Sequence, residues 1–224
     1  MQSSIHHWSF ALRFIVVVGF LSVINTLLFP WEATLEWMIE GGIVENATIF
    51  MYYLALASLW LFPPRALTRM GIAAISLLLL AAAARELDLH KATFGMSILK
   101  TNFYRSYASG TQIAGALLIL LPIFAAIIYL IVKYRRQLVK SAKARDPAAV
   151  TVVTTLIFLV LVKAFDSFIG FIGGYLSKPG EIWGYTTPAG LITMAMEESL
   201  ELALPLLVVV AVIQARRQQL QLPE

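Results

Sequence analysis

The sequence has no cysteine and only three histidines among its 224 residues. The absence of cysteine excludes a disulfide framework, a thiol nucleophile, an iron–sulfur cluster and a cysteine-ligated zinc site. The scarcity of histidine makes a typical zinc centre, which relies mainly on imidazole ligands, a poor match. The motifs H-E-x-x-H, G-x-S-x-G and the P-loop are absent as well. The sequence therefore lacks the usual signatures of metalloproteases, serine hydrolases and P-loop nucleotide-binding proteins.

Charged residues are also scarce, and apolar residues dominate the chain. Hydrophobic residues make up 59% of the sequence and charged residues 13%, and the mean hydropathy is +0.80. This composition is too apolar for a soluble globular domain of this length. We therefore predict an all-α, polytopic integral membrane protein with one transmembrane domain over residues 1–224.

Six apolar segments are long enough to span a bilayer, which requires about 20 residues of helix. The predicted spans lie at about 8–29, 43–62, 67–88, 111–132, 147–174 and 188–213. The stretch between the third and fourth spans mixes aromatic and basic residues, and we expect an outer-face interfacial or re-entrant segment there. Residues 31–40 place Glu32, Glu36 and Glu40 on one helical face, which predicts a short helix on the membrane surface.

The charges are sorted along the chain in a way that predicts the topology. Ten of the 17 lysines and arginines follow the second, fourth and sixth spans, whereas four lie in the opposite loops. The positive-inside rule therefore places both termini in the cytoplasm, in a membrane that we expect to be a bacterial cytoplasmic (inner) membrane. Because the basic and acidic residues are separated in this way, the net charge of +4 reports topology and does not indicate nucleic-acid binding.

Three carboxylates lie in the last span, at Glu197, Glu198 and Glu201. Each acid near the bilayer centre costs about 2.5 to 3.5 kcal/mol on insertion scales, so this group is expected to have internal partners and to mark a site. Helical spacing places Glu197 and Glu201 on one face, and Pro205 leaves the carbonyl of Glu201 without its helical hydrogen bond. The paired glutamates resemble those of CAAX-type membrane proteases, but the arginine that follows them in that family is missing, as is any histidine after His90.

A second polar group lies at the outer ends of the second and third spans. If the third helix continues through this group, Glu86 and His90 are i,i+4 neighbours, and Arg85 and Asp88 form an i,i+3 pair. A cavity open to the outer face would collect both groups of acids. We predict catalytic roles for Glu45, Asp88 and Glu198, substrate binding by Arg85, Lys91 and Lys100, and metal ligation by Glu86, His90, Glu197 and Glu201.

The chemistry of these residues allows more than one interpretation. Several carboxylates with one imidazole suit a divalent metal ion, which is the cofactor we consider. Without a metal, crowded acids suit general acid–base catalysis or proton coupling. The simpler alternatives are an intramembrane ion pair between Lys163 and Asp166, a solvated helix end at residues 85–91, and a surface role for His90.

Three functions follow from this pattern. The first is a membrane-embedded enzyme, such as a hydrolase, that acts on a lipid or lipid-linked substrate from the outer (periplasmic) face. The second is a small ion- or proton-coupled transporter, for which midmembrane acids are common. The third is a non-enzymatic assembly or sensor protein. The expected partner is membrane lipid and not nucleic acid, with a homo-oligomer or another membrane protein as further alternatives.

Overall fold

The computed structural model describes residues 4–38, 41–176 and 187–221, with the backbone alone for residues 4, 165–176 and 221. The described residues are 85% helical and contain no strand, which confirms the predicted all-α class. The α-helices are α1 (Phe10–Leu28), α2 (Trp31–Met38), α3 (Ile43–Leu61), α4 (Arg69–Glu86), α5 (Leu89–Phe94), α6 (Gly110–Lys143), α7 (Pro147–Leu176) and α9 (Pro188–Gln221). Short helical turns are η1 (Ser4–His6) and the π-helical η2 (Phe103–Tyr107).

Several segments are long and apolar enough to cross a membrane, as the composition predicts. Within the described residues there are four: Phe10–Leu28, Trp31–Leu61, Gly110–Lys143 and Pro147–Ala164. The second of them runs through α2 and α3 and includes residues 39–40, which lie outside the described part. The protein is therefore a helical membrane protein by length and composition of its helices.

Helices α7 and α9 begin where the sequence predicts, because proline fits the first helical position and a preceding polar side chain caps the free N–H groups. Asp146 precedes α7, and its Oδ1 accepts a hydrogen bond at 2.7 Å from the backbone N–H of Ala149 in the first turn of the helix. The backbone N–H of Gly190 donates to Thr187 Oγ1 at 3.0 Å at the start of α9. Helix α9 then continues through Pro205.

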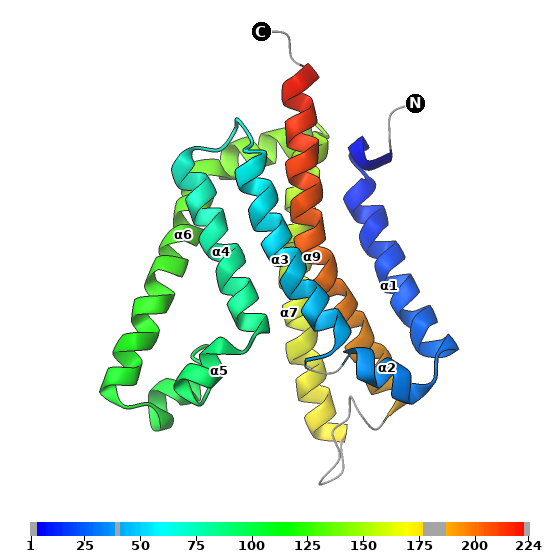
Figure 1. The fold of residues 1–224 in the computed structure, drawn as a ribbon, viewed down its shortest axis with the longest axis vertical. Coiled ribbons are helices and arrows are strands. Elements are labelled where there is room, and N and C mark those ends of the chain that lie inside the picture. Colours follow the sequence, from blue (N-terminus) through cyan, green and yellow to red (C-terminus); the bar gives the residue numbers. More distant parts are fainter. Residues whose placement is uncertain (1–3, 39–40, 177–186, 222–224) are drawn as a thin grey trace.

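Helix α9 is the centre of the bundle. It packs against α1, α3 and α7, while α4 packs against α3 and α6 (Figure 1). Small side chains on α9, such as Ala195 and Ala203, are almost fully buried and let neighbouring helices approach closely. Helix α6 is instead exposed along most of its length, with Leu118 at 77% exposure. An exposed apolar helix of this kind is suited to lipid contact.

Residues 91–110, which the sequence predicts to be interfacial or re-entrant, form α5, a turn and η2. Phe94, Ile98 and Phe103 are buried together against Ala116 of α6. This cluster joins the end of α4 to the start of α6, so the aromatic residues of the segment serve as its core. The position of this segment at the outer membrane surface stays a prediction.

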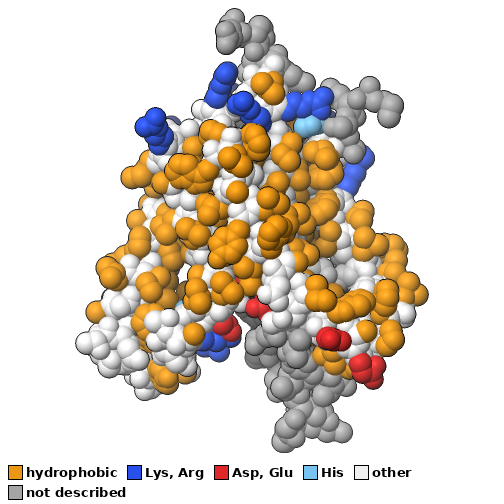
Figure 2. Space-filling view, in the orientation of Figure 1, with side chains coloured by type: hydrophobic (Ala, Val, Ile, Leu, Met, Phe, Trp, Pro, Cys, Tyr) orange, Lys and Arg blue, Asp and Glu red, His pale blue; other side chains and the backbone are white. Residues whose placement is uncertain are grey.

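Charge is distributed unevenly along the long axis of the molecule. Both described chain ends lie at one end of the bundle, where the backbone carbonyl of Ile5 accepts a hydrogen bond from Gln214 Nε2 at 2.6 Å (Figure 1). Figure 2 shows most Lys and Arg side chains gathered at this end, and Asp and Glu side chains in the opposite half. The sorting of charge predicted from the sequence is therefore present in three dimensions.

The contact between α7 and α9 at the basic end depends on Gln214, which is 1% exposed. Its Oε1 accepts from the buried Thr151 hydroxyl at 2.8 Å. Replacing it in Gln214→Leu leaves buried polar groups without partners, which we expect to destabilise the fold by about 1 to 3 kcal/mol. Thermal unfolding in detergent measures the loss, with Gln137→Leu on the exposed surface of α6 as the matched control. Equal midpoints for the two variants would contradict the structural role of Gln214.

Candidate functional site

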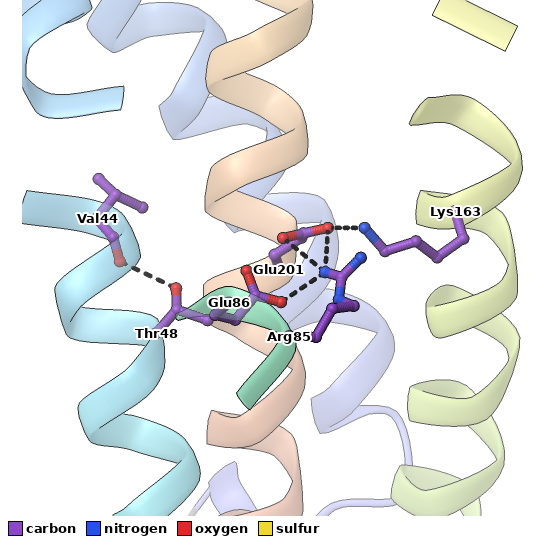
Figure 3. Close-up of polar contacts among 6 residues, drawn as sticks. All are labelled: Val44, Thr48, Arg85, Glu86, Lys163 and Glu201. Carbon is purple, nitrogen blue, oxygen red and sulfur yellow. Dashed lines mark hydrogen bonds and ion pairs between the residues drawn. The ribbon is translucent and has the colours of Figure 1, made fainter. Parts of the chain in front are cut away.

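The carboxylate of Glu201 lies where α4, α7 and α9 meet, and two cations contact it. Lys163 Nζ of α7 donates to Glu201 Oε1, and Arg85 Nη2 of α4 lies 3.2 Å from Oε1 and 3.3 Å from Oε2. Figure 3 shows Lys163 of α7 and Arg85 of α4 both pointing toward this carboxylate. The sequence prediction that the acids of the last span have internal partners is therefore correct for Glu201.

A second carboxylate completes the group on the α4 side. Glu86 Oε1 accepts from Arg85 Nη2 at 2.5 Å, so Arg85 lies between two carboxylates (Figure 3). We call Arg85, Glu86, Lys163 and Glu201 the charged cluster. Its two cations and two anions balance, and this reduces the cost of placing four charges among apolar helices.

The four side chains of the charged cluster differ in exposure. The side chains of Glu86 and Glu201 are 8% and 7% exposed, whereas those of Arg85 and Lys163 are each 34% exposed. The carboxylates therefore form the inner part of the cluster and the cations its accessible part. Both cations are therefore held by buried carboxylates while part of each side chain stays accessible.

Helix α3 contributes a polar face to the same region, which sequence reasoning missed. Tyr52 is 8% exposed, and its phenol lies within range of the charges of Glu86, Glu201 and Arg85. Thr48, 1% exposed, lies one turn earlier and donates to the carbonyl oxygen of Val44 at 2.9 Å. Thr48, Tyr52 and Ala55 are spaced i, i+4 and i+7, so they share one face of the helix. This spacing is visible in the sequence.

Glu198 lies next to the charged cluster but is not part of it. Its half-buried carboxylate is within range of the negative charges of Glu201, Glu197, Glu86 and Glu45. Among the residues that the structure describes, no donor hydrogen-bonds to it. Glu198 therefore keeps its hydrogen-bonding capacity for a group from outside the described residues.

Glu45 has a local role at the start of α3. The backbone N–H of Gly41 donates to Glu45 Oε2, and the Asn46 side chain donates to the carbonyl oxygens of Gly41 and Gly42 at 2.9 and 2.8 Å. These bonds hold the turn that precedes the helix. The catalytic role predicted for Glu45 stays a prediction.

The third predicted span does not continue through the motif at residues 85–91. Helix α4 ends at Glu86, and Asp88 adopts a left-handed conformation with φ of 49° before α5 begins at Leu89. Glu86 and His90 are therefore not i,i+4 neighbours in one helix. Asp88 pairs with Lys91 at 2.5 Å, while Arg85 pairs with Glu86 and Glu201. The conditional pairing of Arg85 with Asp88 is absent for the same reason.

His90 and Lys100 lie on the segment that follows α4. Burial, together with the positive charges of Lys91 and Arg85, lowers the pKa of His90, although the charge of Asp88 opposes this effect. The imidazole is therefore neutral at pH 7. Lys100 is exposed. The head-group role predicted for Lys91 and Lys100 stays a prediction.

The predicted metal ligands do not assemble into one set within the described part of the chain. No group of three or more His, Asp or Glu side chains there is placed to hold a metal ion. Glu86 and Glu201 do approach each other, but the guanidinium of Arg85 occupies the place between them. The side chain of Asp166, the predicted partner of Lys163, lies outside the described residues, as do Glu40 and residues 177–186.

The exposed pair between Asp88 and Lys91 provides a contrast with the charged cluster. Their side chains are 41% and 47% exposed, and solvent screens such pairs. We expect Lys91→Ala to change the free energy of unfolding by less than about 1 kcal/mol. Thermal unfolding at low and high salt measures this. A loss as large as that caused by altering the charged cluster would assign the pair an unexpected structural role.

Comparison with known proteins gives no further information on this site. No family model, curated protein or solved structure matches the chain. The function is therefore argued from the geometry of the charged cluster, Tyr52 and Glu198.

Proposed function

We propose that the protein is a membrane-embedded enzyme that acts on a lipid or lipid-linked substrate with an anionic group. The observation that carries this proposal is the pair of cations, Arg85 and Lys163, that are one-third exposed and supported by two nearly buried carboxylates. An accessible guanidinium beside an ammonium group is suited to phosphate or carboxylate recognition. Because α6 and other long helices expose apolar side chains, the substrate would arrive from the membrane.

The proposed chemistry depends on the position of Glu198. A half-buried carboxyl without a hydrogen-bond donor among the described residues, within range of Glu86 and Glu201 of the charged cluster, is suited to general acid or base catalysis. Tyr52 contributes a buried phenol on the opposite helix α3. In this arrangement Arg85 and Lys163 bind the anionic group, and Glu198 transfers a proton to or from the reacting group.

The proposed topology has six membrane spans. Four of these spans are the segments long and apolar enough to cross a membrane. The other two are α4 and α9, which pack beside them within the bundle. The basic end that carries both termini lies in the cytoplasm, as the positive-inside rule indicates, and the charged cluster opens to the outer face. The proposed location is a bacterial inner membrane.

A metal-dependent reaction is not part of the proposal, because Arg85 separates the two carboxylates that come closest together. Elemental analysis of the purified protein, wild type beside Glu198→Gln, tests the metal prediction directly. Roughly stoichiometric metal in the wild type alone would reinstate the coordination site.

Proton-coupled transport is the second candidate function. It is favoured by Glu201, whose two cations come from different helices, since protonation there would loosen α4 and α7 from α9 at once. It ranks second because α9 carries no ionisable residue from Leu202 to Ala215, so no polar path along this helix leads to the basic end.

The first experiment is deletion of the gene in its source organism, followed by mass spectrometry of lipids and lipid-linked intermediates. We expect one anionic species to accumulate, to return to normal on complementation, and to be consumed by the purified protein in detergent. Unchanged lipid pools in the deletion strain would contradict the enzyme proposal. Uptake into proteoliposomes driven by a pH gradient would instead support the transporter.

A further inference from the structure

A groove separate from the charged cluster lies between α1, α2 and α9. Its volume is about 470 Å³, which is within the range of about 300 to 1,000 Å³ usual for small-molecule sites. Helix α1 contributes residues from Val18 to Asn25, Phe29 follows its end, α2 contributes Trp37 and Met38, and α9 contributes residues from Ser199 to Leu206. Nine of the twelve lining residues are apolar or tryptophan, so the groove is suited to a hydrocarbon ligand.

The groove contains an unpartnered buried hydroxyl. Ser22, which is 4% exposed, has a side-chain oxygen without any hydrogen-bond partner, although a helical serine normally bonds to a carbonyl of the preceding turn. Asn25, one turn later, and Ser199 on the facing helix also line the groove. Neither makes a side-chain hydrogen bond within the described residues. Leaving a buried hydroxyl unpaired costs about 1 to 3 kcal/mol, and a ligand oxygen would remove that cost.

The rim of the groove faces the apolar surface of the bundle. Leu21 and Phe29, which line it, are 55% and 48% exposed. A ligand dissolved in the bilayer therefore reaches the groove without crossing water.

The groove and the charged cluster lie on opposite faces of α9. Ser199, Ala203 and Leu206 recur at the spacing of one helical face, and all three line the groove. Glu201 is two residues from both Ser199 and Ala203, which places it about 200° round the helix. Occupancy of the groove is therefore independent of the function proposed for the charged cluster.

We propose that this groove holds one acyl chain of a membrane lipid, with the ester carbonyl of that chain accepting a hydrogen bond from Ser22. The hydroxyl lies seven residues from Phe29, or about 10 Å along α1, below the exposed acids Glu32 and Glu36 of α2. A helix from a second copy does not fit, because three turns of a helix about 10 Å wide fill on the order of 1,200 Å³.

The test uses a phosphatidylglycerol with a diazirine in one acyl chain, added at one molecule per protein to delipidated protein in detergent. After irradiation, we expect adducts on peptides covering residues 18–29 and 199–206. Ala203→Phe, which fills the groove, should abolish these adducts. Ser22→Ala, which keeps the shape of the groove, should reduce them about threefold to tenfold, the loss of one hydrogen bond. Leu118→Phe on the exposed side of α6 is the matched control and should label as the wild type does.

Two outcomes would overturn the proposal. One is labelling spread over exposed helices such as α6 in proportion to their surface, unchanged in Ala203→Phe and Ser22→Ala. The other is cross-linking between two protein copies through the same peptides, which would assign the groove to self-association. Because Ser22→Ala removes a single oxygen, its result stands even where Ala203→Phe fails to fold.

Discussion

Glu201→Leu is expected to lower the free energy of unfolding by about 2 to 4 kcal/mol, the largest stability effect of any single change considered. The substitution leaves Lys163 and Arg85 without the carboxylate that both contact. Breaking a fully buried pair costs about 3 to 5 kcal/mol, and this value is reduced here because each cation is 34% exposed and reaches water. For a protein of this size we expect the unfolding midpoint to fall by about 5 to 15 °C. Thermal unfolding in detergent, followed by size-exclusion chromatography, measures it.

A double substitution separates the missing charge from the missing side chain. In Lys163→Met with Glu201→Leu the ammonium group that contacted the missing carboxylate is removed as well, so part of the lost stability should return, as replacement of buried ion pairs by apolar groups allows. The matched control is Glu32→Gln, which removes a charge from the exposed face of α2 and should change stability by no more than about 0.5 kcal/mol. If Glu201→Leu behaves like this control, the charged cluster does not hold α4 and α7 against α9.

The features that the sequence predicted well are those that depend on local physics. The composition indicated helices that span a membrane, and polar–proline pairs placed the first residues of α7 and α9 correctly. Helix α4, by contrast, ends at Glu86, two residues before the predicted boundary, because Asp88 takes a left-handed turn. No residue in that stretch is a glycine or proline that would have indicated the break, and the polar run reads equally well as a continuing helix.

The partners of the site residues were less predictable than the residues themselves. Sequence spacing shows neighbours within one helix, and it therefore favoured Lys163 with Asp166. The structure places Glu201, 38 residues away, in contact with Lys163, and the pairing of Lys163 with Asp166 stays a prediction because the side chain of Asp166 lies outside the described residues. Long-range pairs of this kind depend on which helix faces pack together, and a single sequence does not contain that information. Tyr52 was overlooked for a different reason, since a lone tyrosine in an apolar span carries no charge that requires a partner.

Glu198→Gln is expected to reduce turnover by about 10² to 10⁴, the range that removal of a general acid or base usually costs. Glutamine has nearly the same shape but does not exchange a proton at neutral pH. Because no described residue donates a hydrogen bond to Glu198, the fold should be retained, with an unfolding midpoint within a few degrees of the wild type. The measurement is the rate at which purified protein consumes the species that accumulates in the deletion strain.

The comparison with Glu201→Leu makes this prediction specific to catalysis. A loss of activity that merely followed instability would be largest in Glu201→Leu and small in Glu198→Gln, whereas a proton-transfer role gives an inactive but stable Glu198→Gln protein. Retention of full activity by that protein would exclude Glu198 as the acid or base. The charged cluster would then be an anion-binding and packing element, and the two cations alone would remain as the functional part of the site. Glu32→Gln, with the same loss of one carboxylate on an exposed surface, should retain both stability and activity.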